Sequence, residues 1–146
     1  MVTKSEKSKT MAAILLSIIF LFLSAIHIYW AAGGKWGVSV SIPKTNENNI
    51  VFQPGIIATL IVAIGLLGFA LISLGNLGLF DAFVARKWII YATYAIIGIF
   101  VLRGIGDFKY AGLTRKIKNT DFAKFDKMYF TPLCFLIALL AFLAVK

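Results

Sequence analysis

The chain has 146 residues, of which 60% are hydrophobic and only 14% are charged, and its formal net charge is +9. An ordinary soluble domain carries about 25% charged residues, so this composition excludes a soluble enzyme, a disordered tail and a secreted disulfide scaffold. The one cysteine, Cys134, excludes an intrachain disulfide, and the one histidine, His27, excludes a bis-histidine haem. Together they offer too few ligands for zinc, and we expect neither a metal nor a cofactor.

Four apolar segments are long enough to cross a bilayer, which needs about 20 residues. They cover residues 11–32, 54–80, 88–107 and 128–145. Lipid cannot satisfy free backbone groups, so segments that cross it are helical. The remaining residues are too few and too scattered for a separate soluble domain. We therefore predict one all-α domain over residues 1–146, folded as a four-helix transmembrane bundle.

The first span carries its polar residues on one face. Ser17, Ser24 and His27 are separated by seven and three residues, and we expect this face to point into the bundle. The imidazole of His27 is suited to relay protons or to hold an anionic or carbonyl group. The structural alternative is a hydrogen bond from His27 to a neighbouring helix or to Tyr129.

Aromatic residues mark the end of the first span and the loop that follows it. Tyr29, Trp30 and Trp36 lie where the chain leaves the membrane. Trp and Tyr are enriched at that level of a bilayer. We expect these three side chains to form an aromatic rim around a binding pocket.

The second span contains Gly65, Gly68 and Gly75 on one smooth face. Small residues allow membrane helices to approach closely, so we interpret this face as a helix-packing surface. It lies in mid-membrane and lacks the spacing of a phosphate-binding loop.

The third span ends in the segment Arg103-Gly104-Ile105-Gly106-Asp107. Arg103 and Asp107 are four residues apart, which predicts an intrahelical ion pair. In the functional interpretation, Arg103 binds a carboxylate or phosphate and Asp107 orients it. The glycines between them would allow a ligand or a helix to approach the backbone.

Six basic residues are mixed with aromatic and aliphatic ones in the loop 108–127. Asn119 or Thr120 could cap a short helix in which Phe122, Phe125 and Tyr129 share a face. We expect this amphipathic segment to lie on the bilayer surface and to turn into the last span at Pro132. Its basic residues would either anchor the loop to headgroups or cover an anionic ligand.

Four spans place both termini and the short loop 81–87 on one side of the membrane, here called the terminal side. The long loops 33–53 and 108–127 then share the other side, the loop side. The polar residues of the spans and of their ends converge there, namely His27, Arg103, Asp107, Asp126 and Tyr129. Lysine and arginine counts favour a cytoplasmic loop side, whereas the lysines before the first span favour a cytoplasmic terminal side. The orientation therefore stays open.

Three ordered motifs resemble the signatures of a known family. They are HIYWAAGG from His27 to Gly34 followed by Pro43, RGIGDF from Arg103 to Phe108, and DFAKFD from Asp121 to Asp126 followed by Tyr129, Pro132, Leu133 and Cys134. Over nearly its whole length the chain is similar to the bacterial domain-of-unknown-function 3995 family. This resemblance implies a small four-helix integral membrane protein, and it carries over no activity.

The leading functional hypothesis is a non-catalytic protein that binds or passes a small polar or amphiphilic ligand, anionic or lipid-like. Its pocket would lie on the loop side, between the five converging residues and the aromatic rim. One alternative is an enzyme acting on a lipid or isoprenoid, with His27 or Asp126 as general acid or base and Arg103 on a phosphate. Another is an accessory or scaffold subunit that uses the glycine face.

The expected partners follow from charge and from the membrane. The net positive charge suits contact with the anionic headgroups of a lipid bilayer, and the glycine face suits a second copy or another membrane protein. Without a soluble domain, nothing would present a surface that reads nucleic acid. The resemblance places the protein in the bacterial inner (cell) membrane as a multi-pass protein.

Overall fold

The computed structural model describes residues 3–47 and 49–146. Four helical runs in it are long and apolar enough to cross a membrane: α1 (Lys4–Ala31), α3 (Ile56–Gly75), α4 (Arg86–Ile105) and the run Asp121–Val145. The short helix α2 (Val38–Ser41) interrupts the first long loop. The described residues contain no β-strand beyond one isolated bridge between Lys44 and Ile50. The predicted four-helix membrane fold is thereby confirmed.

Local signals set the helix ends, which differ from the predicted spans. The side chain of Thr3 accepts a hydrogen bond from the Glu6 N–H in a capping box, so α1 begins at Lys4 instead of residue 11. Gly106 has a φ of +98°, a conformation that an L side chain rarely adopts. Helix α4 therefore ends at Ile105, and Asp107 lies beyond it.

The last span is one helical run in three parts: α5 (Asp121–Phe125), the π-helical turn η1 (Asp126–Phe130) and α6 (Thr131–Val145). Thr120 caps its start by accepting from the Ala123 N–H at 3.1 Å, as expected of a cap. The run does not turn at Pro132, which occupies the first turn of α6, where proline is tolerated. A separate surface helix is thus not confirmed, and Phe122 is buried whereas Phe125 and Tyr129 are exposed.

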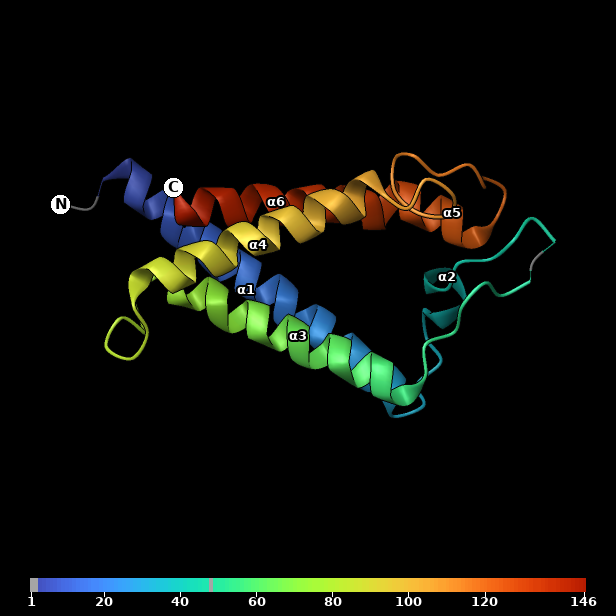
Figure 1. Ribbon diagram of the computed structural model, residues 1–146, viewed down its shortest axis with the longest axis horizontal. Coiled ribbons are helices and arrows are strands. Elements are labelled where there is room, and N and C mark those ends of the chain that lie inside the picture. The colour runs from blue at the N-terminus through green and yellow to red at the C-terminus, as the bar shows by residue number, and fades with distance from the viewer. Residues whose placement is uncertain (1–2, 48) are drawn as a thin grey trace.

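The helices form two antiparallel pairs, α1 with α3 and α4 with α6 (Figure 1). The pairs lie close together at the terminal side and diverge towards the loop side, where α2 lies between them. The apolar core joins the pairs around the middle of the helices, with Phe20, Ile96 and Ile137 fully buried in it. Loop-side groups are therefore distributed between two separate helix pairs.

Hydrogen bonds fix the first pair. The hydroxyl of Ser17 donates to the carbonyl of Ala70 at 3.0 Å, and that of Ser24 donates to the carbonyl of Ala63 at 2.8 Å. Both serines are buried, which confirms the predicted inward face of the first span for these two residues. Such bonds join membrane helices because the alternative is an unsatisfied hydroxyl in hydrocarbon.

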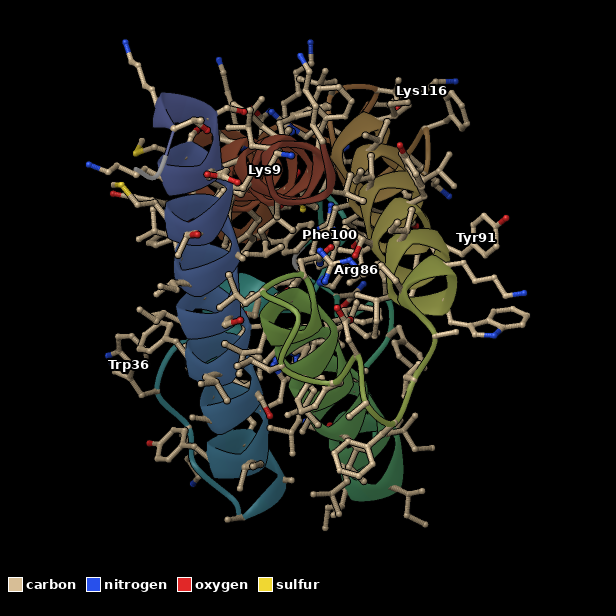
Figure 2. The ribbon with its side chains drawn as sticks, turned by 90° about the vertical axis from the view of Figure 1, so that its left-hand side faces the viewer. Lys9, Trp36, Arg86, Tyr91, Phe100 and Lys116 are labelled. Carbon is tan, nitrogen blue, oxygen red and sulfur yellow. The ribbon has the colours of Figure 1, made fainter. Side chains whose placement is uncertain are left out.

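At the terminal side, polar contacts join α3 to α4. Arg86 points inward between these helices, whereas Tyr91 points away from them (Figure 2). The Arg86 guanidinium donates to the carbonyls of Gly75 at 2.9 Å and Asn76 at 2.7 Å. It thereby supplies a donor to the Asn76 carbonyl and a second donor to the Gly75 carbonyl, which also accepts from the Gly78 N–H. The Asn76 amide donates to Thr93 of α4 at 2.8 Å, so hydrogen bonds join α3 to α4 at this end of the bundle.

Candidate functional site

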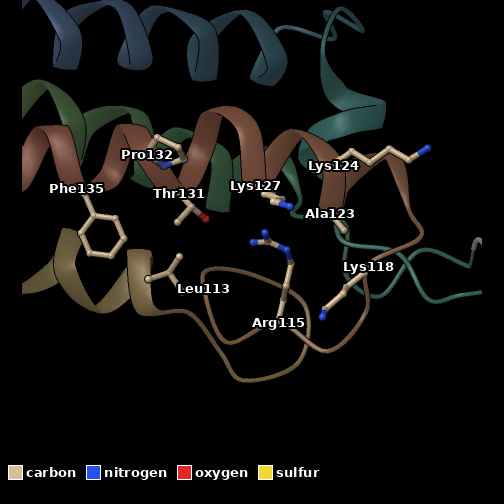
Figure 3. Close-up of a pocket in the computed structure, with 9 residues that line it drawn as sticks. All are labelled: Leu113, Arg115, Lys118, Ala123, Lys124, Lys127, Thr131, Pro132 and Phe135. Carbon is tan, nitrogen blue, oxygen red and sulfur yellow. The ribbon is translucent and has the colours of Figure 1, made fainter.

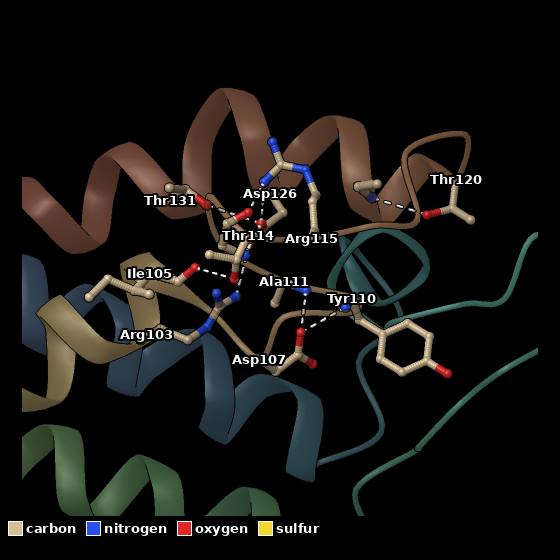
Figure 4. Close-up of polar contacts among 12 residues, drawn as sticks. Arg103, Ile105, Asp107, Tyr110, Ala111, Thr114, Arg115, Thr120, Asp126 and Thr131 are labelled. Carbon is tan, nitrogen blue, oxygen red and sulfur yellow. Dashed lines mark hydrogen bonds and ion pairs between the residues drawn. The ribbon is translucent and has the colours of Figure 1, made fainter.

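The loop-side end of α4 and the last helical run meet at Asp126, whose side chain is fully buried (Figure 4). Its Oδ1 accepts from the Arg103 guanidinium at 3.0 Å. Its Oδ2 accepts from Arg115 at 3.0 Å, from the Gly112 N–H at 2.7 Å and from the Thr131 hydroxyl at 3.0 Å. We call these five residues the Asp126 cluster. A buried carboxylate needs such partners, because burial of an unpaired charge is costly.

Two local features of the backbone build this cluster. The π-helical turn η1 widens the helix after Asp126. The Thr131 hydroxyl, just beyond the end of this turn, donates to the Asp126 side chain at its start. A Cβ atom on Gly106 would lie less than 3.0 Å from the backbone of Ala111 and Gly112. A Cβ atom on Gly112 would lie equally close to the backbone of Ile105 and Gly106. The two glycines therefore let the loop fold back tightly onto the end of α4, which brings the Gly112 N–H to Asp126.

The predicted ion pair between Arg103 and Asp107 is wrong. Arg103 pairs with Asp126. The Oδ1 atom of Asp107 instead accepts from the backbone N–H groups of Lys109, Tyr110 and Ala111 at 3.0, 2.7 and 2.9 Å (Figure 4). Burial raises the pKa of Asp107, but these bonds outweigh it, so the pKa lies below its ordinary value of 3.8. Asp107 thus shapes the loop and does not orient Arg103.

The Asp126 cluster carries an excess of positive charge, since two guanidinium groups share one carboxylate. Arg103 retains a buried Nη1 atom that has no hydrogen-bond partner within residues 3–47 and 49–146. The side chain of Arg115 is 9% exposed and uses only Nη1 for its bonds to Asp126 and to the Gly112 carbonyl. Its Nη2 and Nε atoms have no hydrogen bond to the described residues and are available to another acceptor.

A pocket of about 590 Å³, here called the basic pocket, lies beside the cluster (Figure 3). Four cationic side chains line it: Arg115, Lys118, Lys124 and Lys127. The rest of its wall comes from Leu113, Ala123, Thr131, Pro132 and Phe135. Arg115 and Thr131 belong to both the cluster and the pocket, so the buried carboxylate positions part of the pocket wall. The described residues of this wall include no carboxylate.

The residues predicted to share one pocket are divided among several places. His27 and Trp30 line a pocket of about 480 Å³ between α1, α2 and the start of α3, here called the His27 pocket. Arg103 and Asp107 line a different pocket of about 400 Å³. Asp126 is buried, and Tyr129 is an exposed residue whose ring packs on Phe125 at 5.5 Å. Arg103 and Asp126 do meet, but the helix pairs diverge, so His27 on the first pair lines a pocket of its own.

The side chain of His27 makes its hydrogen bond within its own helix, α1. Its Nδ1 atom lies 2.8 Å from the Leu23 carbonyl, so the predicted bond to another helix or to Tyr129 is not present among the described residues. A carbonyl accepts only, which means that Nδ1 carries the proton and Nε2 is the free nitrogen. The Nε2 atom is therefore an acceptor, and it has no hydrogen-bond partner among the described residues.

Tyr29 and Trp36, two of the predicted rim aromatics, hold the loop, and neither is among the described residues that line the His27 pocket. The Trp30 Nε1 atom donates to the Trp36 carbonyl at 2.8 Å, and the Trp36 N–H donates to the Tyr29 hydroxyl at 3.4 Å. A Cβ on Gly34 would overlap the Tyr29 ring, so only glycine allows this close packing. These contacts fold residues 33–37 back over the end of α1.

The predicted packing face of the second span is divided too. A Cβ on Gly75 would lie 3.0 Å from Ile89, so this glycine does pack against α4. Around Gly65 and Gly68 nothing lies within 4 Å of such a Cβ. In α4, a Cβ on Gly104 would meet the Phe135 ring at 2.8 Å. Close packing by a glycine is thus strongest between α4 and α6.

The cluster includes residues that sequence reasoning does not single out, namely Arg115, Gly112 and Thr131. Arg115 is one of six basic residues in a loop for which the sequence favours contact with headgroups. Its burial depends on the fold of residues 106–112 and on the π-helical turn, which leave no periodic signal. The nearest signal is the pattern around Asp126 in the third motif.

These features define a multi-pass helical membrane protein with two antiparallel helix pairs and a charged cluster at the loop side. The chain belongs to the family described as "Protein of unknown function (DUF3995)", whose model matches residues 20–141. The resemblance to this family is thereby confirmed. No curated protein and no solved structure matches the chain.

Proposed function

We propose that the protein binds an anionic amphiphile, a phospholipid with an accessible phosphate group, in the basic pocket. The observation that carries this proposal is the set of four cationic side chains beside an apolar wall. Arg and Lys are the residues that recognise phosphate, Arg through its planar fork and Lys as a mobile point charge. Leu113, Pro132 and Phe135 suit the acyl region of the same molecule.

The position of the pocket supports an amphiphile over a soluble anion. The basic pocket lies where the loop after α4 covers the start of α6, at the level where a spanning helix leaves the hydrocarbon. Lys118, Lys124 and Lys127 are exposed and can reach headgroups. Arg115 is held in place by Asp126, so its free N–H groups are preorganised for an acceptor and lose little conformational entropy on binding.

The test compares two matched pairs of lysines on the same side of the membrane. The Lys124→Gln/Lys127→Gln variant removes two charges from the basic pocket. The control, Lys109→Gln/Lys116→Gln, removes two charges from exposed residues of the preceding loop that do not line it. Native mass spectrometry of protein in detergent, with added phosphatidylglycerol or phosphatidylcholine, counts the bound lipids.

We expect the parent protein and the control to retain phosphatidylglycerol in preference to phosphatidylcholine. The pocket variant should lose this preference by roughly thirtyfold, since each of its two removed cations contributes about 1 kcal/mol near an anionic surface. Equal loss in both variants would show that only the net charge matters and would refute a specific site. Equal binding of the two lipids by the parent protein would refute the proposal as well.

We propose further that the protein resides in a bacterial inner membrane, with anionic lipid headgroups as its ordinary partners. The support is its four apolar helical runs together with its net charge of +9. Separation of inner and outer membranes on a density gradient, followed by immunoblotting, tests the location. Recovery in the outer-membrane fraction would contradict it.

A further inference from the structure

The His27 pocket is separate from the basic pocket and from the Asp126 cluster. Its wall comes from the end of α1, from α2 and from the residues that lead into α3. None of its described lining residues belongs to the Asp126 cluster or to the basic pocket. A function for it is therefore argued independently of the phospholipid proposal.

Few polar groups of this pocket are free to meet a ligand. The Nδ1 atom of His27 is bound to the Leu23 carbonyl, and the indole N–H of Trp30 is bound to the Trp36 carbonyl. The free groups are the Nε2 atom of His27, the ammonium of Lys35 and the side-chain amide of Gln53, none of which has a hydrogen bond or ion pair to the described residues. They supply one fixed positive charge together with hydrogen-bonding capacity.

The charge of this pocket differs from that of the basic pocket. Lys35 is its one fixed cation, and no carboxylate is among its described lining residues. Four cations suit a phosphate, whereas one cation beside an amide donor suits a carboxylate, which has a single charge and two acceptor oxygens. Lys35 is exposed, and a neutral alcohol would not supply the counter-charge that a carboxylate offers to its ammonium.

The shape suits a ligand with an apolar tail. Phe52, Val38, Ile42 and Val62 supply apolar wall. Val62 lies six residues after Ile56, the first residue of α3, which at 1.5 Å per residue places it about 9 Å further along that helix. The pocket thus extends from the polar loop towards the depth of the acyl chains.

The wall of the pocket is preorganised. Tyr29 packs on Gly34, and the Trp30 and Trp36 contacts hold residues 33–37 against the end of α1. The His27 and Trp30 rings are 5.0 Å apart in an edge-on arrangement, which fixes the imidazole beside the indole. A wall that is ordered before binding reduces the entropy cost of binding.

We propose that the His27 pocket is a second binding site, specific for the carboxylate end of a long-chain amphiphile such as a fatty acid. Lys35 pairs with the carboxylate, the side-chain amide of Gln53 donates a hydrogen bond to it, and the chain follows the apolar wall past Val62. Trp30 lies beside the bound ligand, which makes it a built-in reporter.

The test uses this tryptophan in a Trp36→Phe/Trp88→Phe background, which leaves Trp30 as the one tryptophan of the chain. Dibromostearate quenches a nearby indole, and its methyl ester has the same chain without the charge. Both are titrated into the protein in detergent above neutral pH, with brominated phosphatidylcholine as a measure of unspecific contact. The variants are Lys35→Gln and, as a matched control in the same loop, Lys44→Gln, which does not line the pocket.

We expect the acid to quench Trp30 at a concentration roughly tenfold lower than the ester, the ratio that one charged hydrogen bond provides. Lys35→Gln should remove this preference and Lys44→Gln should retain it. Equal quenching by acid and ester in the parent protein would overturn the proposal. Loss of the preference in both variants, or in neither, would overturn the role of Lys35 in it.

Discussion

At the scale of single residues, the buried carboxylate of Asp126 joins the loop after α4 to the last helical run. It accepts hydrogen bonds from Arg103 on α4, from Gly112 and Arg115 in the loop, and from Thr131 on α6. Removal of one partner of a buried pair leaves the other charge uncompensated, which costs more than the pair itself contributes. Asp126 is therefore the residue on which this end of the fold depends most.

We expect Asp126→Asn to lower the free energy of unfolding by about 3 kcal/mol, since the mostly buried Arg115 loses its counter-charge. The control is Asp121→Asn, which breaks an exposed pair with Lys124 at 3.7 Å and should cost about 0.5 kcal/mol. Unfolding by sodium dodecyl sulfate in mixed micelles measures both. Similar losses in the two variants would contradict the importance of burial.

The sequence indicates that Arg103 and Asp126 matter, but its spacing pairs Arg103 with Asp107. That pairing assumes a helix that continues through Asp107, and the positive φ of Gly106 ends the helix first. A glycine near a helix end allows the helix either to continue or to end. Here the tight contact between Gly106 and Gly112 ends it. Contacts of this kind are tertiary, so no local pattern reveals them.

At the scale of helices, the α4–α6 contact depends on a glycine. The ring of Phe135 in α6 lies 2.8 Å from the position that a Cβ atom on Gly104 would take. Gly98 lies on the same helix, and nothing lies within 4 Å of the position that a Cβ would take there. Substitution of alanine at each of these two glycines therefore distinguishes the effect of packing from the effect of helix propensity.

Gly104→Ala is expected to destabilise the protein by about 1–3 kcal/mol, because the ring of Phe135 must shift in a packed interface. Gly98→Ala should stabilise it by up to about 1 kcal/mol, the difference in helix propensity between alanine and glycine. Thermal unfolding in detergent compares them. A gain of stability in both variants would show that α6 does not pack on Gly104 as described.

At the scale of the whole molecule, hydropathy is sufficient to predict the four spans and their order. It is also sufficient to place His27, Arg103, Asp107, Asp126 and Tyr129 on the loop side. It does not show that these residues are divided between two helix pairs, since the apolar segments do not encode which helices become neighbours. The prediction of a single pocket fails for that reason.

Labelling with a membrane-impermeant maleimide tests the arrangement of the loops. In a Cys134→Ala background, Asn46→Cys and Lys118→Cys represent the two long loops, and Ala82→Cys represents the short one; all three positions are exposed. We expect the two long-loop cysteines to be labelled from the same side of sealed membranes and Ala82→Cys from the other. Labelling of the two long loops from opposite sides would refute the four-span topology.

The divergence of the two helix pairs has a consequence for the surrounding lipid. The molecule is narrow where its termini lie and broad at the loop side (Figure 1), so it occupies unequal areas in the two leaflets. A bilayer adapts to a poorly fitting protein at a modest energetic cost. A wedge of this form favours membrane that curves around its broader end, and the stability of the protein is therefore coupled to the spontaneous curvature of its lipids.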